Sequence, residues 1–348
     1  MAYTEVLTGA SITVEQWDSS IFSEYLGQVW WRFVMGTSSN SPIVIVEDLV
    51  KKPGDAITVQ LRGRLTGGHV TGANKGIGNE GKVDFYGQRI TIDNVRDLVK
   101  FEDVPMGQKR TNFNLLQQGK EALVEEAKIR MEDDITTALT TVGSERVRGR
   151  YLYGAADSNW DATHATALTN VDNTSDKLTT LMITVAKRKA QIPVNATARI
   201  RPMRINTGKA FEEWFTFVAH TYCTRDMVEN EAAWKNAQLN IPPKSDASSV
   251  IYSGSSFKGA WDGVLIYEYD RLPLISSTIQ VAHNVLLGAQ AGAIVWGQRS
   301  KFGEEESDVG HDVTYELHEI RGISKLVFDR STTEDNGLVN VYAAAVAD

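Results

Sequence analysis

The residues best suited to chemistry in this sequence are histidines and carboxylates near its C-terminal end. Two of the six histidines, His311 and His318, lie close to an acidic run made of Glu304, Glu305, Glu306, Asp308 and Asp312. Imidazole nitrogens and carboxylate oxygens both bind divalent cations, so this group could hold a metal ion. Its spacing matches neither a zinc motif nor an EF-hand. We therefore predict no metal ligands, and we interpret Lys301 to Asp312 as an acidic loop.

A second candidate is the stretch from Gly76 to Gly81, which matches the pattern G-x-G-x-x-G letter for letter. A dinucleotide site needs a strand before these glycines and a helix N-terminus after them, because the helix presents backbone N–H groups to the pyrophosphate. Here a strand is expected to follow, so we predict no cofactor-binding residues. Thr66 to Gly81, with six glycines among sixteen residues, is better interpreted as the tip of a loop.

The remaining reactive groups favour structural roles. Cys223 is the single cysteine, so an intrachain disulfide is impossible and a structural or merely exposed thiol is the default. Arg199, Arg201 and Arg204 form either a solvated, partly paired face or an anion site. No serine lies in a G-x-S-x-G elbow. We predict no catalytic residues and no enzyme activity, although catalytic groups can converge from distant positions.

Composition narrows the class of protein. With 348 residues, 42% of them hydrophobic and 23% charged, the chain can fold as a globular protein of one or two subdomains. Its formal net charge of -8 argues against a protein that coats nucleic acid, but it is compatible with a shell that encloses nucleic acid. We find no secretory signal and no apolar stretch of about 18 residues, so we expect no membrane association and a cytoplasmic site of synthesis.

One long helix is predicted from Asn112 to Val142. Apolar or small residues recur there every three or four positions, which places them on one helical face: Leu116, Gly119, Leu123, Ala127, Met131, Ile135, Ala138 and Val142. Thr111 or Asn112 can cap its start, and Gly143 follows its end. The charged residues of this stretch, including Glu132, are expected to remain solvated. The helix is either a long core helix or the backbone of an elongated subunit.

A hairpin is predicted from Pro53 to Val95. Apolar and polar residues alternate along both of its strands, and the phase changes at Gly87, which predicts a β-bulge there. A two-stranded hairpin is only marginally stable in water. Its apolar face must therefore lie on its own chain or on another subunit.

The other segments give coarser expectations. Residues 1–41 are interpreted as an arm, with a helical aromatic face between Val14 and Met35 that needs a covering surface. Helices are predicted over 178–192, 224–238 and 280–297, and strands over 211–220 and 250–269. The C-terminal strands, 313–320, 323–328 and 338–346, are expected to form a small sheet.

Several short motifs, in this order, make the chain similar to a tailed-phage major capsid protein of the branch typified by the enquatroviruses. They begin around the hairpin with Gly54-Asp55, Arg62-Gly63-Arg64-Leu65-Thr66-Gly67, Gly78-Asn79-Glu80, Phe85, Ile90-Thr91-Ile92-Asp93 and Arg96. They continue with Gln108 to Thr111, Leu286 to Ala291, Asp308-Val309-Gly310, Gly322-Ile323-Ser324-Lys325 and Phe328-Asp329. Gly81 replaces an expected acidic residue, and Gly154 to Asn173 has no counterpart in the pattern.

The resemblance implies an α+β protein with the Hong Kong 97-type phage capsid fold. It assigns residues 1–41 to an N-terminal arm and 42–100 to an extended hairpin loop, or E-loop, that lies on a neighbouring copy. It assigns 101–149 and 300–348 to a peripheral domain built on the long spine helix, and 150–299 to an axial domain.

The function implied is that of a major capsid protein in the bacteriophage head. Copies would self-assemble through hexamers and pentamers into an icosahedral shell around double-stranded DNA, with scaffolding and portal proteins as further partners. The protein would be assembled in the host cytoplasm and reside in the virion. Two alternatives stay open: an encapsulin-like shell protein, and a cytoplasmic enzyme with a cryptic site near His311 and His318.

Overall fold

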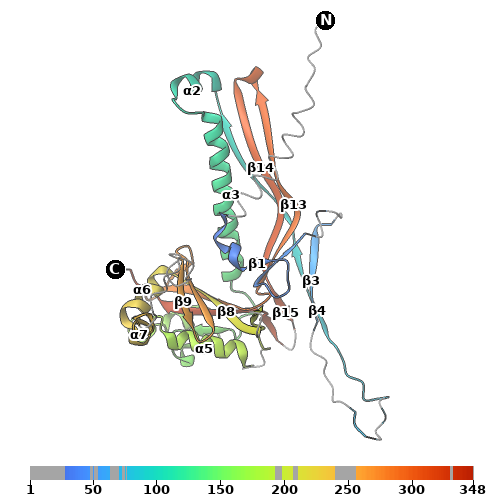
Figure 1. The fold of residues 1–348 in the computed structure, drawn as a ribbon, viewed down its shortest axis with the longest axis vertical. Helices are drawn as coiled ribbons and strands as arrows, with labels where there is room; N and C mark the ends of the chain where they lie inside the picture. The colour runs from blue at the N-terminus through green and yellow to red at the C-terminus, as the bar shows by residue number, and fades with distance from the viewer. Residues whose placement is uncertain are drawn as a thin grey trace.

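The computed structural model describes residues 28–47, 50, 54–62, 70–72, 75, 77–192, 198–206, 211–239, 256–329 and 332–347. The molecule is elongated (Figure 1), with the α2 corner at one end and the tip of the β3–β4 hairpin at the other. Two sheets form its body. The predicted arm falls largely outside the described residues, which begin at Gln28.

The first sheet has five strands in the order β1-β2-β13-β14-β5. Their bounds are β1 (Met35–Gly36), β2 (Ile43–Val46), β13 (Gly292–Ser307), β14 (Asp312–Lys325) and β5 (Asp93–Phe101). The 3₁₀ helix η4 (Asp308–Gly310) connects β13 to β14, and α2 (Val104–Arg110) follows β5. Because β13 and β14 pair along almost their whole length, they form a long ribbon that extends to one end of the molecule.

The long helix predicted from the 3.6-residue period is present as α3 (Leu115–Thr140), and it packs against this sheet. Its buried side includes Leu123, Ala127, Met131 and Ile135, as the spacing predicts. The cap is Asn114, whose side chain accepts a hydrogen bond from the backbone N–H of Gln117 at 3.2 Å, rather than Thr111 or Asn112.

Glu132 corrects the prediction that all charged residues of this helix are solvated, since it is buried. Its carboxylate accepts a hydrogen bond from the backbone N–H of Trp30 at 2.8 Å and pairs with Arg271 at 3.4 Å. Trp30 belongs to the 3₁₀ helix η1 (Trp30–Val34), in which Trp31 is fully buried against the same core as Met131. The end of the predicted arm is therefore covered by its own chain.

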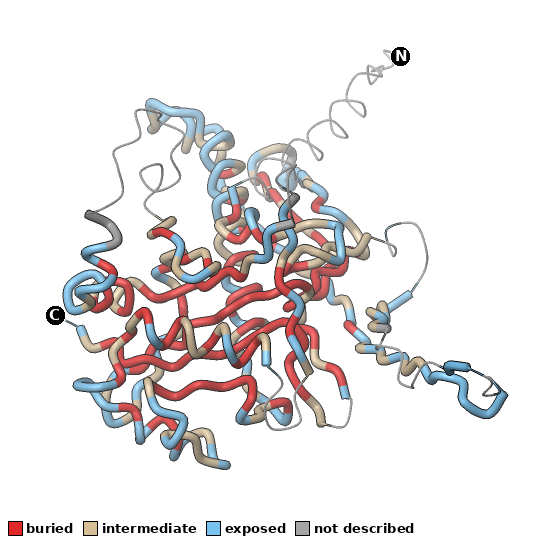
Figure 2. The backbone as a smooth tube through the Cα atoms, turned by 60° about the horizontal axis from the view of Figure 1, so that its bottom comes forward, coloured by how far each residue is buried: buried red, intermediate tan, exposed pale blue. Residues whose placement is uncertain are grey.

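The second sheet has the strand order β6-β17-β12-β8-β10-β9, with β11 beside β12 and β7 beside β8. The bounds are β6 (Tyr151–Tyr153), β7 (Met203–Asn206), β8 (Phe211–Ala219), β9 (Phe257–Trp261), β10 (Val264–Glu268), β11 (Leu274–Ser276), β12 (Gln280–Leu287) and β17 (Leu338–Ala344). Strand β17 and all of β12 except Gln280 are buried, and they belong to the buried centre of the fold (Figure 2).

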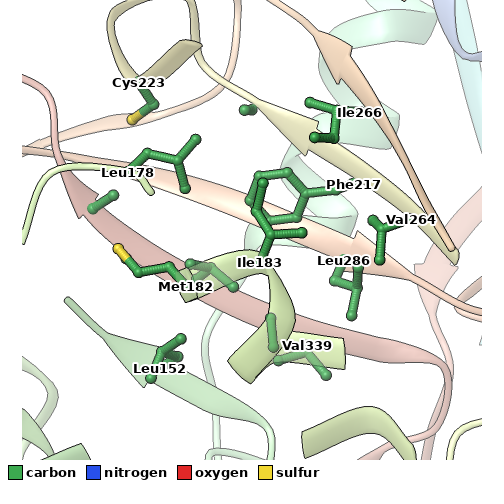
Figure 3. Close-up of a cluster of buried hydrophobic side chains, with 14 of the residues drawn as sticks. Leu152, Leu178, Met182, Ile183, Phe217, Cys223, Val264, Ile266, Leu286 and Val339 are labelled. Atoms are coloured by element: carbon green, nitrogen blue, oxygen red, sulfur yellow. The ribbon is translucent and has the colours of Figure 1, made fainter. Parts of the chain in front are cut away.

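Helix α5 (Thr180–Gln191) packs on this sheet, where Met182 and Ile183 meet Phe217 and Leu286 (Figure 3). The predicted helix over 224–238 is divided into α6 (Thr221–Asn230) and α7 (Ala232–Leu239). The polar stretch after α3 contains η3 (Asp157–Asn159) and α4 (His164–Thr169).

The helix predicted over 280–297 is wrong, since this stretch contains β12 and the start of β13. All residues of β12 except Gln280 are buried. A strand buried on both faces shows a continuous apolar run, which periodicity cannot distinguish from a buried helix.

Two further expectations at the C-terminus need correction. The predicted acidic loop over 301–312 is largely strand, because β13 runs to Ser307 before the turn at η4. Leu338 to Ala344 does not belong to a separate small sheet but lies as β17 between β12 and β6. Just before β17 in the sequence, β15 (Val327–Asp329) and β16 (Thr333–Asp335) form a separate two-stranded sheet.

The hairpin is present as β3 (Ala56–Arg62) and β4 (Phe85–Thr91). Its register is regular through the pair Gln60↔Gly87, so the predicted bulge is wrong. The base of the hairpin packs on its own chain: Ile57, Val59 and Tyr86 lie around Phe328 and Leu326. Of the two supports expected for the apolar face, its own chain supplies the one for this base.

Candidate functional site

The predicted acidic and histidine group does not converge on one point. His311 Nδ1 lies 3.8 Å from Asp103 Oδ1, whereas His318 Nδ1 lies 3.9 Å from Glu316 Oε1. Glu304, Glu305 and Glu306 are consecutive in β13, so their side chains alternate between the two faces of the sheet. Among the described residues, no group of three or more His, Cys, Asp or Glu side chains could hold a metal ion.

The other candidate groups have structural partners. The element after Gly81 is strand β4, so these glycines face no helix N-terminus. Burial raises the pKa of the Cys223 thiol to about 12, which leaves it protonated and unreactive at neutral pH. Arg199 and Arg204 both pair with Glu213, at 3.7 and 3.2 Å, so this cluster is a paired surface.

Large apolar side chains are exposed at both ends of the molecule, and also at Leu98 on β5 and at Leu181 and Ile192 on α5 and its C-cap. At the hairpin end, Ile77 is 88% exposed and Phe85 is 72% exposed. At the opposite end, Met106 is 47% and Phe113 is 53% exposed. Large apolar side chains this accessible, gathered at projecting ends, are typical of surfaces that contact another protein.

Phe85 marks the point where the hairpin leaves its own core. Along β4, alternate residues from Tyr86 to Ile90 face inward, whereas Phe85, Gly87 and Arg89 face solvent. Beyond Phe85, the contacts of the described residues include the local Lys82–Asp84 ion pair at 2.8 Å. The hydrogen bond from the Gly78 N–H at 2.9 Å lowers the pKa of Glu80. Among the described residues of the tip, the charged Lys82 and Asp84 therefore lie close in sequence to the exposed apolar side chains of Ile77 and Phe85.

Gln88 fixes the direction in which the hairpin projects. Its side chain donates hydrogen bonds to Ser324 Oγ at 3.1 Å and to the Lys325 carbonyl at 3.0 Å, and it accepts one from the Val327 N–H at 2.6 Å. Next to it, a Cβ atom at Gly322 would overlap the Thr91 carbonyl, so only glycine allows this close approach. The base of the hairpin is therefore rigidly joined to β14.

A buried charge network lies directly behind this joint, where the two sheets meet. The Lys325 ammonium donates to the Thr141 carbonyl at 2.6 Å and pairs with Glu145 and with Asp335, the latter at 3.0 Å. Burial raises the pKa of Asp335 to about 6 despite the lysine. Burial also acts to raise the pKa of Glu145, but hydrogen bonds from Lys325 and backbone N–H groups lower it overall.

The network continues into the eight-stranded sheet. Asn340 donates to Asp335 at 3.1 Å and contacts His283 Nε2 at 2.7 Å. Burial lowers the pKa of His283 to about 3, so the ring is neutral. This network was not predicted from the sequence. Its members appear there only as single polar residues within apolar strands. Its buried position indicates a role in joining the two sheets rather than in chemistry on a ligand.

Among the described residues, no helix combines the length and the apolar character needed to cross a bilayer. No curated protein matches the sequence.

Solved structures similar to this fold are phage capsids. "Cyanophage Pam1 capsid asymmetric unit" is 23% identical, with a TM-score of 0.77 and coverage of 91% of this chain and 92% of that chain. "Capsid of Ralstonia phage GP4" is 20% identical, with a TM-score of 0.74 and 92% of each chain covered. The "Acidic stable capsid structure of Helicobacter pylori bacteriophage KHP30" is 13% identical, with a TM-score of 0.68 and 89% of each chain covered.

The sequence itself matches the family described as phage capsid protein over residues 5–347, nearly its whole length. Family and fold agree with the projecting ends of the molecule. The chain belongs to the phage capsid protein family and is a structural protein of the bacteriophage head.

Proposed function

We propose that this protein is the major capsid protein that self-assembles through hexamers and pentamers into an icosahedral shell around double-stranded DNA. The observation that carries the proposal is the hairpin, whose tip extends beyond its own core with Ile77 and Phe85 exposed. Burying such side chains on a neighbouring copy contributes about 25 cal/mol per Å² of apolar area. Repetition over many copies makes a weak individual contact sufficient for a closed shell.

The parts of the chain divide the work as follows. Residues 1–41 act as the N-terminal arm and 42–100 as the E-loop. Residues 101–149 with 300–348 form a peripheral domain on the spine helix α3, and 150–299 form the axial domain. The strand β17 extends from the second peripheral segment into the sheet of the axial domain, which supports a rigid connection between the two.

The enclosed DNA makes no sequence-specific contacts in this proposal. A net charge of -8 disfavours strong adhesion of DNA to the shell during packaging. Scaffolding and portal proteins are the further partners, assembly takes place in the host cytoplasm, and the protein has no enzyme activity.

An encapsulin-like shell is the second candidate, because a projecting hairpin with an uncovered tip suits any closed shell of identical copies. The genes around this one separate the two functions. Terminase and portal genes next to it support the phage head, whereas the gene of an enzyme cargo supports the cellular shell.

The direct test is assembly of the purified chain, measured by sedimentation velocity and negative-stain microscopy. We expect capsomers or closed particles, and a chain that stays a monodisperse monomer under assembly conditions contradicts the proposal. Deletion of residues 67–81 is the matched variant. Since these residues precede β4 and its packed base, the deletion is expected to preserve the melting temperature of the folded chain and to abolish particles.

A further inference from the structure

The end of the molecule opposite the hairpin has a corner that is both basic and apolar. Helix α2 turns into α3 there, with Met106 and Phe113 about half exposed, at 47% and 53%. Lys109 and Arg110 occupy the last turn of α2, and neither forms an ion pair within the part of the chain that the structure describes. We call Met106, Lys109, Arg110 and Phe113 the basic corner.

The basic corner is rigid although it is exposed. The Gln108 side chain donates to the Phe113 carbonyl at 2.8 Å and accepts from the Leu115 N–H at 3.0 Å. The Thr111 hydroxyl donates to the carbonyls of Gly107 and Phe113, both at 3.2 Å. Because the backbone is already ordered, a partner that covers Phe113 does not have to order this turn.

An acidic surface lies beside this corner, where β13 turns into β14. We call Glu305, Glu306 and Asp308 the acidic turn. All three are exposed, and none forms an ion pair with another described residue. Like charges this close repel one another, and a cationic surface relieves that repulsion.

Within one copy, the two surfaces lie side by side, and among the described residues no ion pair joins them. The N-terminal end of α2 is fixed to the turn, since the Val104 N–H donates to the His311 carbonyl at 2.8 Å and the Asp103 N–H to Asp312 at 3.3 Å. The Asp312 carboxylate already forms an ion pair with Lys100, with Nζ 3.1 Å from Oδ2. Lys109 and Arg110 lie in the last turn of α2, at the opposite end of the helix from these two hydrogen bonds.

We propose that the basic corner of one copy binds the acidic turn of a second copy, in a contact between two different surfaces that repeats from copy to copy. The contact pairs Lys109 and Arg110 with Glu305 and Glu306, while Met106 and Phe113 are covered. Different patches meet in such a contact, so it is heterologous and closes into a ring when the rotation permits. This contact names one interface of the proposed shell, and it therefore rests on the proposed function.

The neighbouring charges favour a second copy over nucleic acid as the partner. A phosphate backbone that approached the basic corner would meet the acidic turn next to it. A second copy of this chain carries an acidic turn that can face the basic corner and a basic corner of its own beside it. The contact also uses the end of the molecule that the hairpin leaves unused, so each end serves a different neighbour.

The test is charge reversal on each side and on both. Lys109→Glu with Arg110→Glu, and separately Glu305→Lys with Glu306→Lys, are expected to retain the wild-type melting temperature. Each is expected to reduce the particle yield at least tenfold in sedimentation velocity, with the loss steeper at low salt. The variant with all four substitutions is expected to regain particles. Glu229→Lys with Glu231→Lys, at the end of α6, changes the net charge by the same amount as Glu305→Lys with Glu306→Lys, and this control should assemble normally.

Three outcomes overturn the contact: normal assembly of either reversed variant, a folded four-site variant that stays unassembled, or loss of assembly in the control. Failure of the wild-type chain to form particles overturns the proposed shell function and this contact together. Normal particles from both reversed variants overturn the contact alone.

Discussion

The ring of Phe101 lies directly against the backbone of Gly119, so that strand β5 and helix α3 approach each other without an intervening side chain. A Cβ atom at Gly119 would overlap Cε2 and Cζ of this ring. The same contact surface includes Leu116, Val99 and Tyr315. This close approach sets the distance between the long helix and the sheet that it covers.

Gly119→Leu is expected to destabilise the fold by about 1–3 kcal/mol, because the larger side chain overpacks this contact and outweighs the better helix propensity. Chemical denaturation measures the free energy of unfolding. The double variant with Phe101→Ala should recover part of the loss, since the ring that blocks the site is removed. Equal losses in the single and double variants would show that the ring does not set the spacing.

Phe85→Asp and Tyr86→Asp are neighbouring substitutions on opposite faces of the hairpin, and we expect them to separate assembly from folding. Phe85 faces solvent, so the charge should leave the melting temperature unchanged while particle yield falls. Tyr86 faces the cluster of Phe328, so the charge there should cost about 1–3 kcal/mol of stability. Thermal denaturation gives the melting temperatures of the two variants, and sedimentation velocity gives their particle yields. A lower melting temperature for Phe85→Asp would place its ring in the core.

Lys325→Met is expected to cost about 3–5 kcal/mol, because it leaves the carboxylates of Glu145 and Asp335 buried without their cation. Lys301→Met on the exposed part of β13 is the control and should change stability by less than about 0.5 kcal/mol. Urea denaturation compares them. A Lys325 variant as stable as the control would mean that the network adds no net stabilisation.

The pH dependence of stability should reveal His283. Its folded pKa of about 3 lies below the ordinary 6.5, so between these values the unfolded chain binds a proton that the native state does not. Its contribution to stability is therefore lost as pH falls from 6.5, at about 1.4 kcal/mol per pH unit. Asp335 acts in the opposite direction between pH 6 and 3.8, since its raised pKa makes the native state bind the proton first.

His283→Gln should therefore become more stable relative to wild type as the pH is lowered, whereas Asp335→Asn should become less stable relative to wild type over pH 6 to 4. Melting temperatures of the three proteins from pH 7 to 4 provide the comparison. Parallel curves for wild type and His283→Gln would mean that the native ring takes up its proton over the same pH range as the unfolded chain, so that burial does not lower its pKa.

The elements that could be predicted from the sequence are those with one solvent-exposed face and one buried face. Helix α3 and the hairpin strands satisfy this condition, since Leu123 and Met131 alternate with charged residues at helical spacing. Strand β12 does not, because it is covered on both faces and shows no period. The strand predicted over 338–346 is present as β17, but its pairing with β12 and β6 could not be predicted. The acidic run from Glu304 misled for a related reason: it lies on a strand whose end extends into solvent.

The assembly surfaces could be predicted in part. The glycine-rich tip pointed to a projecting hairpin, but the periodicity of its strands did not show that Ile57 and Val59 pack on Phe328 of the same chain. Contacts between residues more than two hundred positions apart leave no mark in a single sequence. The Lys325 network was missed on the same ground, since its members come from five separate segments.

The Gln88 clamp has a mechanical consequence for a hairpin whose tip is docked on a neighbour. The clamp grips the carbonyl of Lys325, and the ammonium group of that same lysine holds Glu145 and Asp335 together. Tension on the docked tip therefore reaches the seam between the two sheets in part through Lys325, which is bonded at both its carbonyl and its ammonium group. A shell that swells or is strained would load this seam in every subunit at once.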